Sequence, residues 1–383
     1  MTILFLTPEF PHAKLGPSGG IGTSIKNLAA SLTDLGVGVR ILIYGQKADA
    51  VWEENGIIFE TLQNIKFKGF SWYLTRKKIE KRINQLYSEK KVDLVEAPDW
   101  TGITSFIQPN CPIVIRMNGS DTYFCHLDGR QVKFWNRFHE KRALKKANGL
   151  ISVSQFTADV TRELFQLKKE ITIIPNGIAI EAFKSGHTNP ESNHVILYFG
   201  TLIRKKGALE LPLIFNEVIK SNPNAELLLI GKDSADIFTG STSTWELMKP
   251  LFSEEALKQT TYSGGMPYDQ MRNQIDLASV CVFPTFAEAL PVSWLEAMAM
   301  KKAIVASNIG WASEMIANDI EGYLVHPKQQ HEYALKIVEL LNNPEKALIF
   351  GNNAFKKVVS TFESKIVAQK AVDFYVKIVN ERT

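Results

Sequence analysis

Two glutamates in the last third of the chain, Glu288 and Glu296, have the spacing of a ligand site. They are eight positions apart in residues 286–300 (FAEALPVSWLEAMAM). The apolar, β-prone residues 279–285 predict a short buried strand just before them. Pro291 suits the first position of the helix that follows, where its missing N–H is not needed. The pattern therefore places Glu288 in the loop at the C-terminal end of a strand and Glu296 on the next helix.

That arrangement suits a ligand that carries phosphate between two sugars. The N–H groups at a helix start favour an anion, and carboxylates accept hydrogen bonds from sugar hydroxyls. A nucleotide-sugar has both parts. The residues expected at this helix start are Leu290, Pro291, Val292 and Ser293. On the spacing alone, a simpler interpretation also holds, in which the acidic residues only complement the helix dipole.

The residues around the pair favour the ligand site. Residues 288–316 (EALPVSWLEAMAMKKAIVASNIGWASEMI) resemble the donor-binding segment of glycosyltransferase family 4, the retaining GT-B glycosyltransferases. The family pattern is Glu, seven residues, Glu, then Ala-Met-Ala, a strand, and a helix start led by Glu. Here the last three parts are residues 297–299, 303–307 and 314–316. The resemblance covers nearly the whole chain and implies an α/β GT-B fold, with two Rossmann-like doubly wound parallel-sheet domains that face each other across a cleft.

The order of elements along the chain agrees with that fold. Strand-like and helix-like segments alternate, which predicts two parallel sheets with helices on both faces and ligands at the C-terminal strand ends. A length of 383 residues favours two domains. We expect an acceptor-binding domain over 1–185, a nucleotide-sugar-binding domain over 186–360, and a terminal helix over 361–383 that crosses back to the first domain. The polar, turn-rich residues 184–194 are the expected linker.

Basic residues and glycines after other predicted strands complete the expected donor site. Lys206 precedes a glycine, as in the family's Lys-Gly, whose lysine contacts the donor diphosphate. Thr201 stands where the family usually has arginine, so Arg204 is expected to supply that charge. The resemblance further implies that Glu288 binds hydroxyls of the transferred sugar and Glu296 binds the ribose. It also assigns donor contacts to Gly19, Gly20, Gly231 and Met266.

Polar residues at strand ends in the first half are candidates for acceptor binding. They are Glu96, Asp99, Arg116 and Asp121. For Glu96 and Asp99, a capped turn before the next helix is an equally simple interpretation. The family commonly has a histidine that contacts the donor sugar where this chain has Asn118. Asparagine donates and accepts hydrogen bonds but does not exchange a proton as histidine does, so the residue type argues against an acid–base role at this catalytic position.

Two basic runs are interleaved with aromatic residues, over 64–91 and 130–146. The first contains nine Lys and Arg but only two Glu. Basic amphipathic helices with aromatic residues bind anionic membrane surfaces, so peripheral membrane contact is one interpretation. The other is a solvated helix face whose aromatic residues pack inward. No nucleic-acid-binding module accompanies the charge, so we expect no nucleic-acid partner.

Composition narrows the class of protein further. The chain is 45% hydrophobic and 22% charged, with no apolar stretch long enough to span a bilayer. Its opening residues, MTILFLTP, lack the features of a secretion signal. We therefore expect a cytoplasmic protein with peripheral contact to the inner face of the membrane. Three scattered cysteines and no paired-Asp motif predict neither a disulfide framework nor a metal site, and no cofactor is expected beyond the nucleotide-sugar.

Together with these features, the resemblance implies retaining, metal-independent transfer of a hexose from a UDP- or GDP-sugar to a glycan or lipid-linked acceptor in cell-surface polysaccharide synthesis. Retention and metal independence are implied by the resemblance alone. A nucleotide-sugar epimerase of the same fold is an alternative, and it would form product without an acceptor. A non-catalytic binder is another, given Asn118 and Thr201. A two-lobed solute-binding protein is disfavoured by the missing secretion signal. Fold alone does not decide among these classes.

Overall fold

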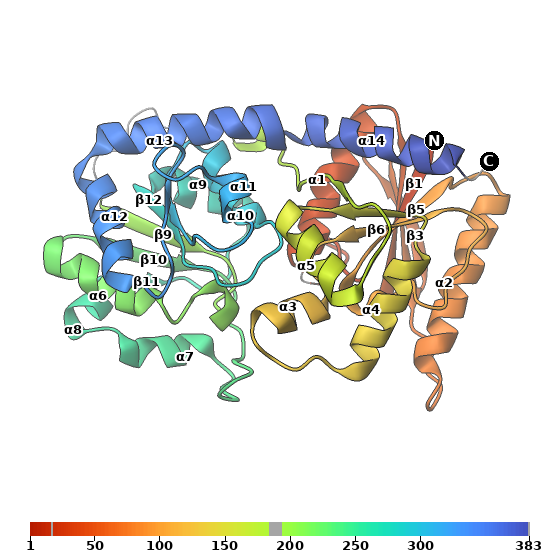
Figure 1. Cartoon of the computed structure of the whole chain (residues 1–383), viewed down its shortest axis with the longest axis horizontal. Helices are drawn as coiled ribbons and strands as arrows, with labels where there is room; N and C mark the ends of the chain where they lie inside the picture. The colour runs from red at the N-terminus through yellow and green to blue at the C-terminus, as the bar shows by residue number, and fades with distance from the viewer. Residues whose placement is uncertain (17, 184–193, 382–383) are drawn as a thin grey trace. The chain divides into compact units, whose positions relative to one another are not determined.

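A computed structural model describes residues 1–16, 18–183 and 194–381. The chain divides into two compact units (Figure 1). Unit 1 comprises Met1–Ala179 and Phe362–Thr383, and unit 2 comprises Ile180–Thr361. The domain boundary expected after residue 185, and all of the expected linker except His194, lie outside the described residues.

Unit 1 is built on an eight-stranded sheet in the order β3-β4-β2-β1-β5-β6-β7-β8. All pairs are parallel except β3 with β4, which form an antiparallel pair at one edge. The sequence analysis missed β3, because its residues are mostly exposed and show no apolar alternation. The strands are β1 (Thr2–Thr7), β2 (Gly38–Gln46), β3 (Ala50–Glu54), β4 (Ile57–Gln63), β5 (Leu94–Pro98), β6 (Ile113–Met117), β7 (Gly149–Ser152) and β8 (Thr172–Ile173).

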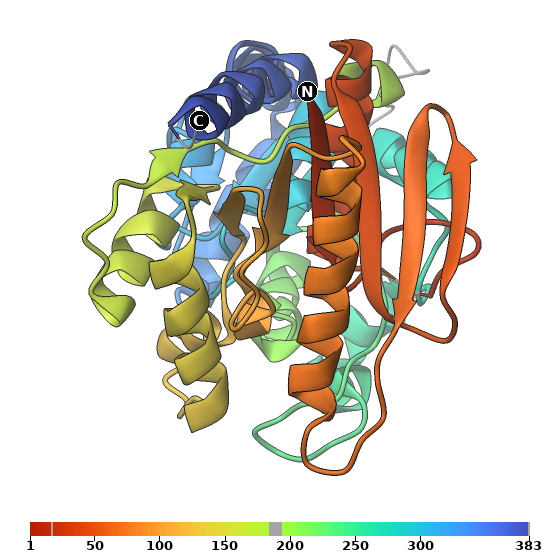
Figure 2. The ribbon, with the colours of Figure 1, turned by 90° about the vertical axis from the view of Figure 1, so that its right-hand side faces the viewer.

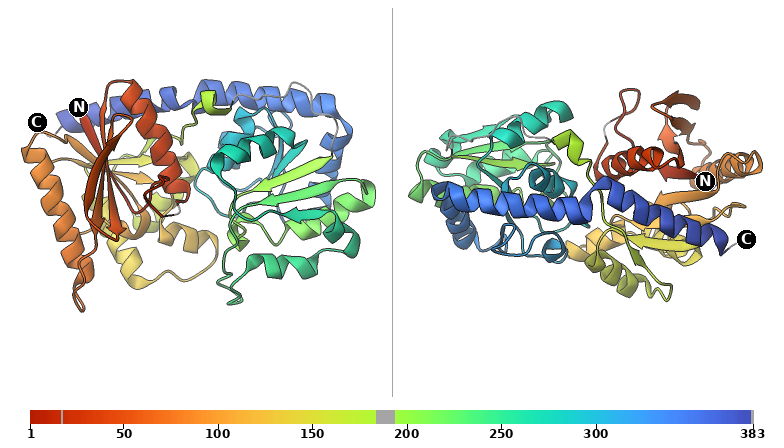
Figure 3. Two further views of the ribbon diagram at one scale, coloured as in Figure 1. Left: turned by 180° about the vertical axis from the view of Figure 1, so that it is seen from behind. Right: turned by 90° about the horizontal axis from the view of Figure 1, so that it is seen from above.

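Helices cover both faces of this sheet and bury a separate apolar core on each. On one face, α1 and α14 pack together through side chains such as Leu28, Ala371 and Tyr375 (Figure 3). On the other face, α2, α4 and α5 contribute side chains such as Ile79, Leu144 and Phe165 (Figure 2). The helices are α1 (Gly20–Asp34), α2 (Ser71–Ser88), η1 (Trp100–Gly102), α3 (Asp121–Leu127), α4 (Phe134–Lys146), α5 (Gln155–Phe165) and α14 (Ser364–Asn380).

Unit 2 has a six-stranded, all-parallel sheet in the order β11-β10-β9-β12-β13-β14. Its strands are β9 (Val195–Phe199), β10 (Glu226–Ile230), β11 (Thr260–Tyr262), β12 (Val280–Phe283), β13 (Ala303–Ala306) and β14 (Tyr323–Leu324). The strand order reverses between β9 and β12, and ligands of open α/β sheets bind at such a switch point.

The helical segments of unit 2 are η2 (Ile180–Phe183), η3 (Arg204–Lys206), α6 (Leu211–Ser221), α7 (Thr244–Met248), η4 (Lys249–Leu251), α8 (Glu254–Lys258), α9 (Tyr268–Leu277), α10 (Val292–Ala299), α11 (Ala312–Met315), α12 (Gln330–Asn342) and α13 (Pro344–Lys357). The π-helical turn η5 (Val358–Phe362) follows α13 and leads to α14. Short strands of apolar, β-branched residues, such as the fully buried β12, form because both faces of a parallel sheet are covered.

Candidate functional site

Lys206 and Glu288 lie next to each other at the C-terminal edge of the unit 2 sheet. Lys206 Nζ is 2.7 Å from Glu288 Oε1. Lys206 ends the η3 turn after β9, and Glu288 lies in the loop after β12. Because β9 and β12 are neighbours at the switch point of the strand order, residues far apart in the sequence meet there. The sequence analysis predicted both residues as site residues but not their contact.

Backbone contacts hold these two loops together. Gly207 has a φ of +75°, and a Cβ at this position would lie 1.8 Å from the carbonyl oxygen of Pro284. Only glycine fits this close approach. The N–H groups of Phe286 and Ala287 both donate to the carbonyl of Lys205, at 2.8 and 3.1 Å. The basic turn is therefore attached directly to the loop that carries Glu288.

The ion pair keeps Glu288 charged. Burial by itself raises the pKa of this carboxyl, but the charges of Lys206 and Lys205 outweigh it, so its pKa lies below the ordinary value. The side chains of Lys206 and Glu288 remain 26% and 16% exposed. A partly exposed cation beside an ionised carboxylate offers one group for a phosphate and one for sugar hydroxyls.

Helix α10 begins directly after this loop. Its N-cap is Pro291, so the helix proper begins one residue later, at Val292. The sequence analysis expected Pro291 to be the first helical residue. Val292 and Ser293 open the helix and are partly exposed, whereas Leu290 is buried. The N–H groups in the first turn of a helix have no partner within the helix, and the helix dipole favours an anion there. Glu296 lies in the second turn and is 7% exposed.

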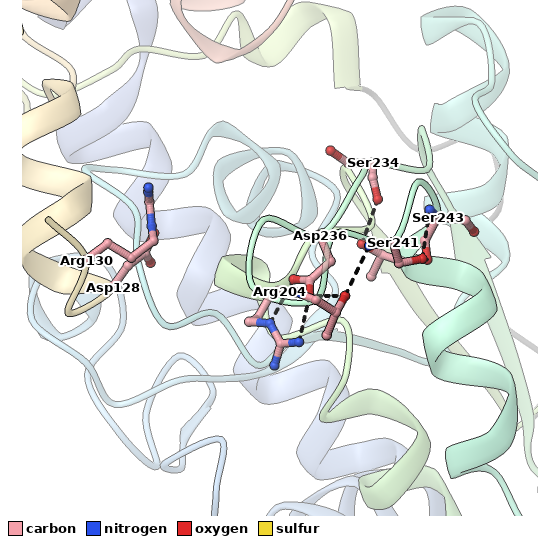
Figure 4. A network of polar contacts seen from close by, with 9 residues as sticks. Asp128, Arg130, Arg204, Ser234, Asp236, Ser241 and Ser243 are labelled. Carbon is pink, nitrogen blue, oxygen red and sulfur yellow. Dashed lines mark hydrogen bonds and ion pairs between the residues drawn. The ribbon is translucent and has the colours of Figure 1, made fainter. Parts of the chain in front are cut away.

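Arg204 is held by a carboxylate that the sequence analysis did not identify. Its Nε and Nη2 donate to Asp236 Oδ1 and Oδ2, both at 2.8 Å (Figure 4). The hydrogen bonds from Arg204 contribute most to lowering the pKa of Asp236 to about 2. Asp236 lies in the loop before α7, where no motif marks it. The pair uses two of the five N–H groups of Arg204, and its carboxylate offsets the charge that an approaching anion would meet.

Two further predicted donor residues, Gly231 and Met266, follow β10 and β11 at the same edge. Gly231 has a φ of +153°, and a Cβ there would lie 1.8 Å from the carbonyl oxygen of Gly200. Its N–H donates to the carbonyl of Gly264 at 2.8 Å. Met266 is partly exposed in the loop after β11. The backbone therefore brings the loops after β9, β10 and β11 close together.

In unit 1, the glycine-rich segment is part of a helix start rather than only a loop. Helix α1 begins at Gly20, three residues earlier than expected, and Gly19 is its N-cap. The carboxylate of Glu9, just after β1, accepts the N–H of Gly22 at 3.1 Å. A Cβ on Gly19 would lie 3.2 Å from Glu9 Oε1. Glu9 thus supports this helix start, a role for which the sequence analysis had no signal.

Glu96 and Arg116 do not fit the acceptor role expected of them. Both are 3% exposed. Arg116 donates to Glu96 through Nε and Nη2, at 2.7 and 3.2 Å, and its Nη1 donates to the carbonyl of Ile174. The hydroxyl of Tyr375 on α14 also donates to Glu96, at 2.5 Å. This buried pair joins β5, β6 and α14, so its polar atoms already serve the interior of unit 1.

Asp99 and Asn118 meet at the ends of β5 and β6. The N–H of Asn118 donates to Asp99 Oδ1 at 3.1 Å, and the Asn118 side chain is partly exposed. Asp99 is fully buried, and its Oδ2 has no hydrogen-bond partner among the described residues. Burial, together with the nearby charge of Glu140, raises the pKa of Asp99 to about 8. Asp99 therefore shapes the turn that presents Asn118.

Asp121 opens α3 and is partly exposed. Its Oδ2 accepts a hydrogen bond from Asn136 Nδ2 at 2.9 Å. Its N–H donates to the buried carboxylate of Glu140 at 2.9 Å. Of the four acceptor candidates, Asp121 alone is not buried.

Three other findings concern a cavity, metal sites and membrane-spanning helices. A cavity of about 460 Å³ between α2 and the β3–β4 edge is lined by residues such as Asp49, Lys78 and Arg82, and by none of the predicted site residues. Within the described part of the chain, no group of three or more His, Cys, Asp or Glu could hold a metal ion. No described helix has the length and apolar character needed to cross a membrane.

Two family models match consecutive parts of the sequence. Residues 18–182 match the model described as Glycosyltransferase Family 4, and residues 179–357 match the model described as Glycosyl transferases group 1. Together they cover residues 18–357, which include most of both units.

Relatives and solved structures agree with these matches. An uncharacterized glycosyltransferase of Methanocaldococcus jannaschii is 22% identical over 92% of both chains. The capsular polysaccharide biosynthesis glycosyltransferase CapM of Staphylococcus aureus is 25% identical over 62% of this chain and 63% of its own. The crystal structure of Anabaena HepE in complex with UDP and glucose has a TM-score of 0.76 at 18% identity, over 98% of this chain and 100% of its own. This last likeness shows that the two units have the GT-B fold, as predicted.

Proposed function

The chain belongs to glycosyltransferase family 4 and is a GT-B glycosyltransferase that uses a nucleotide-sugar donor, and we propose that it transfers a hexose from a UDP-sugar to a glycan or lipid-linked acceptor with retention of configuration and without a metal ion. The observation that carries this proposal is the Lys206–Glu288 pair at the switch point of the unit 2 sheet. The proposed reaction belongs to cell-surface polysaccharide synthesis.

The proposed donor pose follows from the chemistry of that edge. Lys206 binds the diphosphate, with the first-turn amides of α10 assisting, and this stabilises the charge that develops on the leaving nucleotide. Glu288 accepts hydrogen bonds from hydroxyls of the transferred sugar, and Glu296 accepts those of the ribose. Gly231 and Met266 border the nucleotide base. When the diphosphate attracts Lys206, Glu288 exchanges part of its ion pair for sugar hydroxyls.

Arg204 is proposed to contribute less than Lys206 to diphosphate binding, because the carboxylate of Asp236 offsets its charge. The bidentate pair holds two of its N–H groups, at 2.8 Å each. Lys206 is therefore the main cation for the diphosphate. Because Thr201 supplies no charge, the site depends more strongly on Lys206 than the family pattern would suggest.

Two similarities support the choice of substrates. HepE was crystallised with UDP and glucose, which favours a UDP-sugar over a GDP-sugar. CapM is named for capsular polysaccharide biosynthesis, which favours a surface glycan or its lipid-linked precursor as acceptor. We propose that Asp121 and Asn118, the partly exposed polar residues at the β6 end, contact the acceptor side of the reaction. A cytoplasmic enzyme at the inner face of the membrane would meet both substrates.

A panel of UDP-, GDP- and ADP-sugars tests this function. Binding is measured by calorimetry and slow hydrolysis by chromatography, for the wild type and for Glu296→Ala. We expect one preferred UDP-sugar, with binding weakened at least about tenfold by the substitution, because a buried carboxylate loses its bonds to the ribose. The product anomer from NMR and activity in EDTA then test retention and metal independence.

Three results would contradict the proposal. Binding to none of the nucleotide-sugars would mean that the role given to the glutamate helix is wrong. An epimerised nucleotide-sugar formed without acceptor would identify an epimerase. Tight binding with no hydrolysis, and no transfer to any glycan or lipid acceptor, would identify a non-catalytic binder.

A further inference from the structure

The two basic aromatic runs, far apart in the sequence, meet on one surface of unit 1. Trp72 at the start of α2 and His139 on α4 have ring centroids 5.1 Å apart. Phe106, in the loop after η1, joins them, because its ring lies 5.6 Å from Trp72 and 6.2 Å from Phe138. Helices α2 and α4 run side by side in Figure 2, so their first turns share this surface.

Six aromatic side chains are exposed here, and we name them the aromatic patch. Two form a ring pair just before α2, and three others contact one another at the start of α4. Phe134 and Trp135 are 71% and 65% exposed, which is unusual for such large apolar side chains. The six residues of the patch are Phe67, Phe70, Trp72, Phe134, Trp135 and Phe138.

The apolar residues that α2 and α4 need for folding lie elsewhere. Ile79, Ile83 and Leu86 of α2 and Leu144 of α4 are fully buried in the core of unit 1. The alternative interpretation, in which the aromatic side chains of these runs pack inward, therefore does not hold for the six residues of the patch. A cluster of large exposed apolar side chains of this kind marks an interaction site.

Positive charge surrounds the aromatic patch. Lys66, Lys68 and Lys133 are exposed, and none of them has an ion-pair partner among the described residues. The nearest acidic side chain of α4, Glu140, is buried and accepts hydrogen bonds from the N–H groups of Thr101, Asp121 and Thr122. It therefore does not offset the lysines at the surface.

Two arginines lie over the rings at the centre of the patch. Arg142 lies 4.2 Å above the ring of Phe106, and Arg76 lies 5.4 Å above the ring of Trp72. Burial, with the charges of Arg76 and Arg142, lowers the pKa of His139 to about 4, so this ring is neutral at physiological pH. Apolar rings with a rim of lysines form the resulting surface.

We propose that the aromatic patch inserts into the interface of an anionic lipid bilayer. Aromatic rings partition to the boundary between headgroups and acyl chains, while lysine stems extend their charges to the lipid phosphates. The positive charge favours an anionic bilayer over a second copy of this chain as the partner. In an isologous dimer, two identical lysine-rimmed patches would face and repel each other. The proposal rests on the proposed function only in that a bilayer would present a lipid-linked acceptor.

Vesicle binding by the full-length protein tests the proposal without any sugar substrate. Sedimentation is measured with phosphatidylcholine vesicles and with vesicles in which roughly one third of the lipid is phosphatidylglycerol. The test variant is Phe134→Ser with Trp135→Ser. The matched control is Leu348→Ser with Ile349→Ser on α13, because these side chains are similarly exposed, at 59% and 51%, but the lysine near them, Lys346, is paired with Asp319 and Glu339. Quenching of tryptophan fluorescence by brominated lipid reports insertion.

We expect the wild type and the control to bind the anionic vesicles, and the patch variant to bind at least about tenfold more weakly. Binding should weaken with added salt, and brominated lipid should quench the wild type more than Trp135→Phe. UDP-sugar hydrolysis should be equal in all variants, so a failure of the proposed function is recognised separately. Failure of the wild type to bind, equal binding by the patch variant, or a dimer that the patch substitutions dissociate would each overturn the proposal.

Discussion

Replacing Lys206 by methionine separates the electrostatic role of this residue from its packing. Methionine keeps an unbranched apolar chain of similar length but removes the charge that lies 2.7 Å from Glu288 Oε1. Two effects follow. The proposed diphosphate contact is lost, and Glu288 is left in a largely buried position without its nearest cation.

The expected loss of activity is large. Removing one charged contact that strengthens as the leaving group develops charge lowers kcat by about 100- to 1,000-fold. Because the same contact is proposed to bind the ground-state diphosphate, KM for the UDP-sugar should rise as well. Stability should fall by only about 1–2 kcal/mol, below the 3–5 kcal/mol of a fully buried pair, since both side chains keep some exposure to solvent.

The pH dependence of stability provides an independent check. In the wild type the pKa of Glu288 lies below its ordinary value of 4.5, so the stability that its ionised form provides is present above that pH and is lost as the pH falls. In Lys206→Met, burial dominates and the pKa of Glu288 should rise. The difference in unfolding free energy between the two proteins should therefore widen from pH 4 to pH 7, when measured by urea unfolding.

Steady-state hydrolysis and urea unfolding are compared among wild type, Lys206→Met and Lys220→Met. Lys220 on α6 also pairs with a glutamate, but its side chain is 67% exposed. The control should keep full activity and should differ from wild type in stability by less than about 0.5 kcal/mol. If Lys206→Met kept kcat/KM within roughly threefold of wild type, Lys206 would not bind the diphosphate in the transition state, and the reasoning above would be refuted.

Three further substitutions, one of them with a matched control, test other residues described above. Gly207→Ala should destabilise the protein by about 2–4 kcal/mol in thermal unfolding and reduce turnover, because φ is +75° and the carbonyl of Pro284 blocks the Cβ. The control Gly264→Ala has a similar φ of +69° but open space around the Cβ, so it should lose only about 1 kcal/mol. Asp99→Asn should raise Tm more at pH 8 than at pH 5. A carboxyl whose pKa is raised from its ordinary value of 3.8 to about 8 destabilises the fold progressively as the pH rises between these two values. An equal rise in Tm at both pH values would contradict the raised pKa. Asp236→Asn should tighten UDP binding about two- to fivefold in calorimetry, because the charge of Arg204 is no longer offset by a carboxylate. Weaker binding would show that Asp236 instead positions Arg204 for the diphosphate.

Local sequence patterns were sufficient for the elements that carry the site. The run before Glu288 formed the buried strand β12, and the proline after it preceded helix α10, because strand and helix starts depend on residues only a few positions apart. The family pattern also identified Lys206 as a site residue, since Lys-Gly is a contiguous signature. Boundaries were less accurate, as for α1, which begins within the glycine-rich segment instead of after it.

The exposed edge strand β3 and the contacts between distant residues required the tertiary structure. Glu96 and Arg116 had the pattern of polar strand-end residues, yet they pair with each other in the interior, because β5 and β6 are adjacent and Tyr375 of α14 covers them. The sequence indicated that Arg204 could bind the diphosphate, but it did not show that Asp236, in the loop before α7, pairs with it.

The sequence by itself determined which segments become strands and helices, which family the chain belongs to, and which charged residues the donor site can draw on. Only the tertiary structure decided which of those charges are already paired, and that two separate aromatic runs form one exposed surface. The physical reason is that propensity and hydrophobic periodicity act over neighbouring residues, whereas pairing and burial depend on the order of strands in a sheet and on which helices pack beside them.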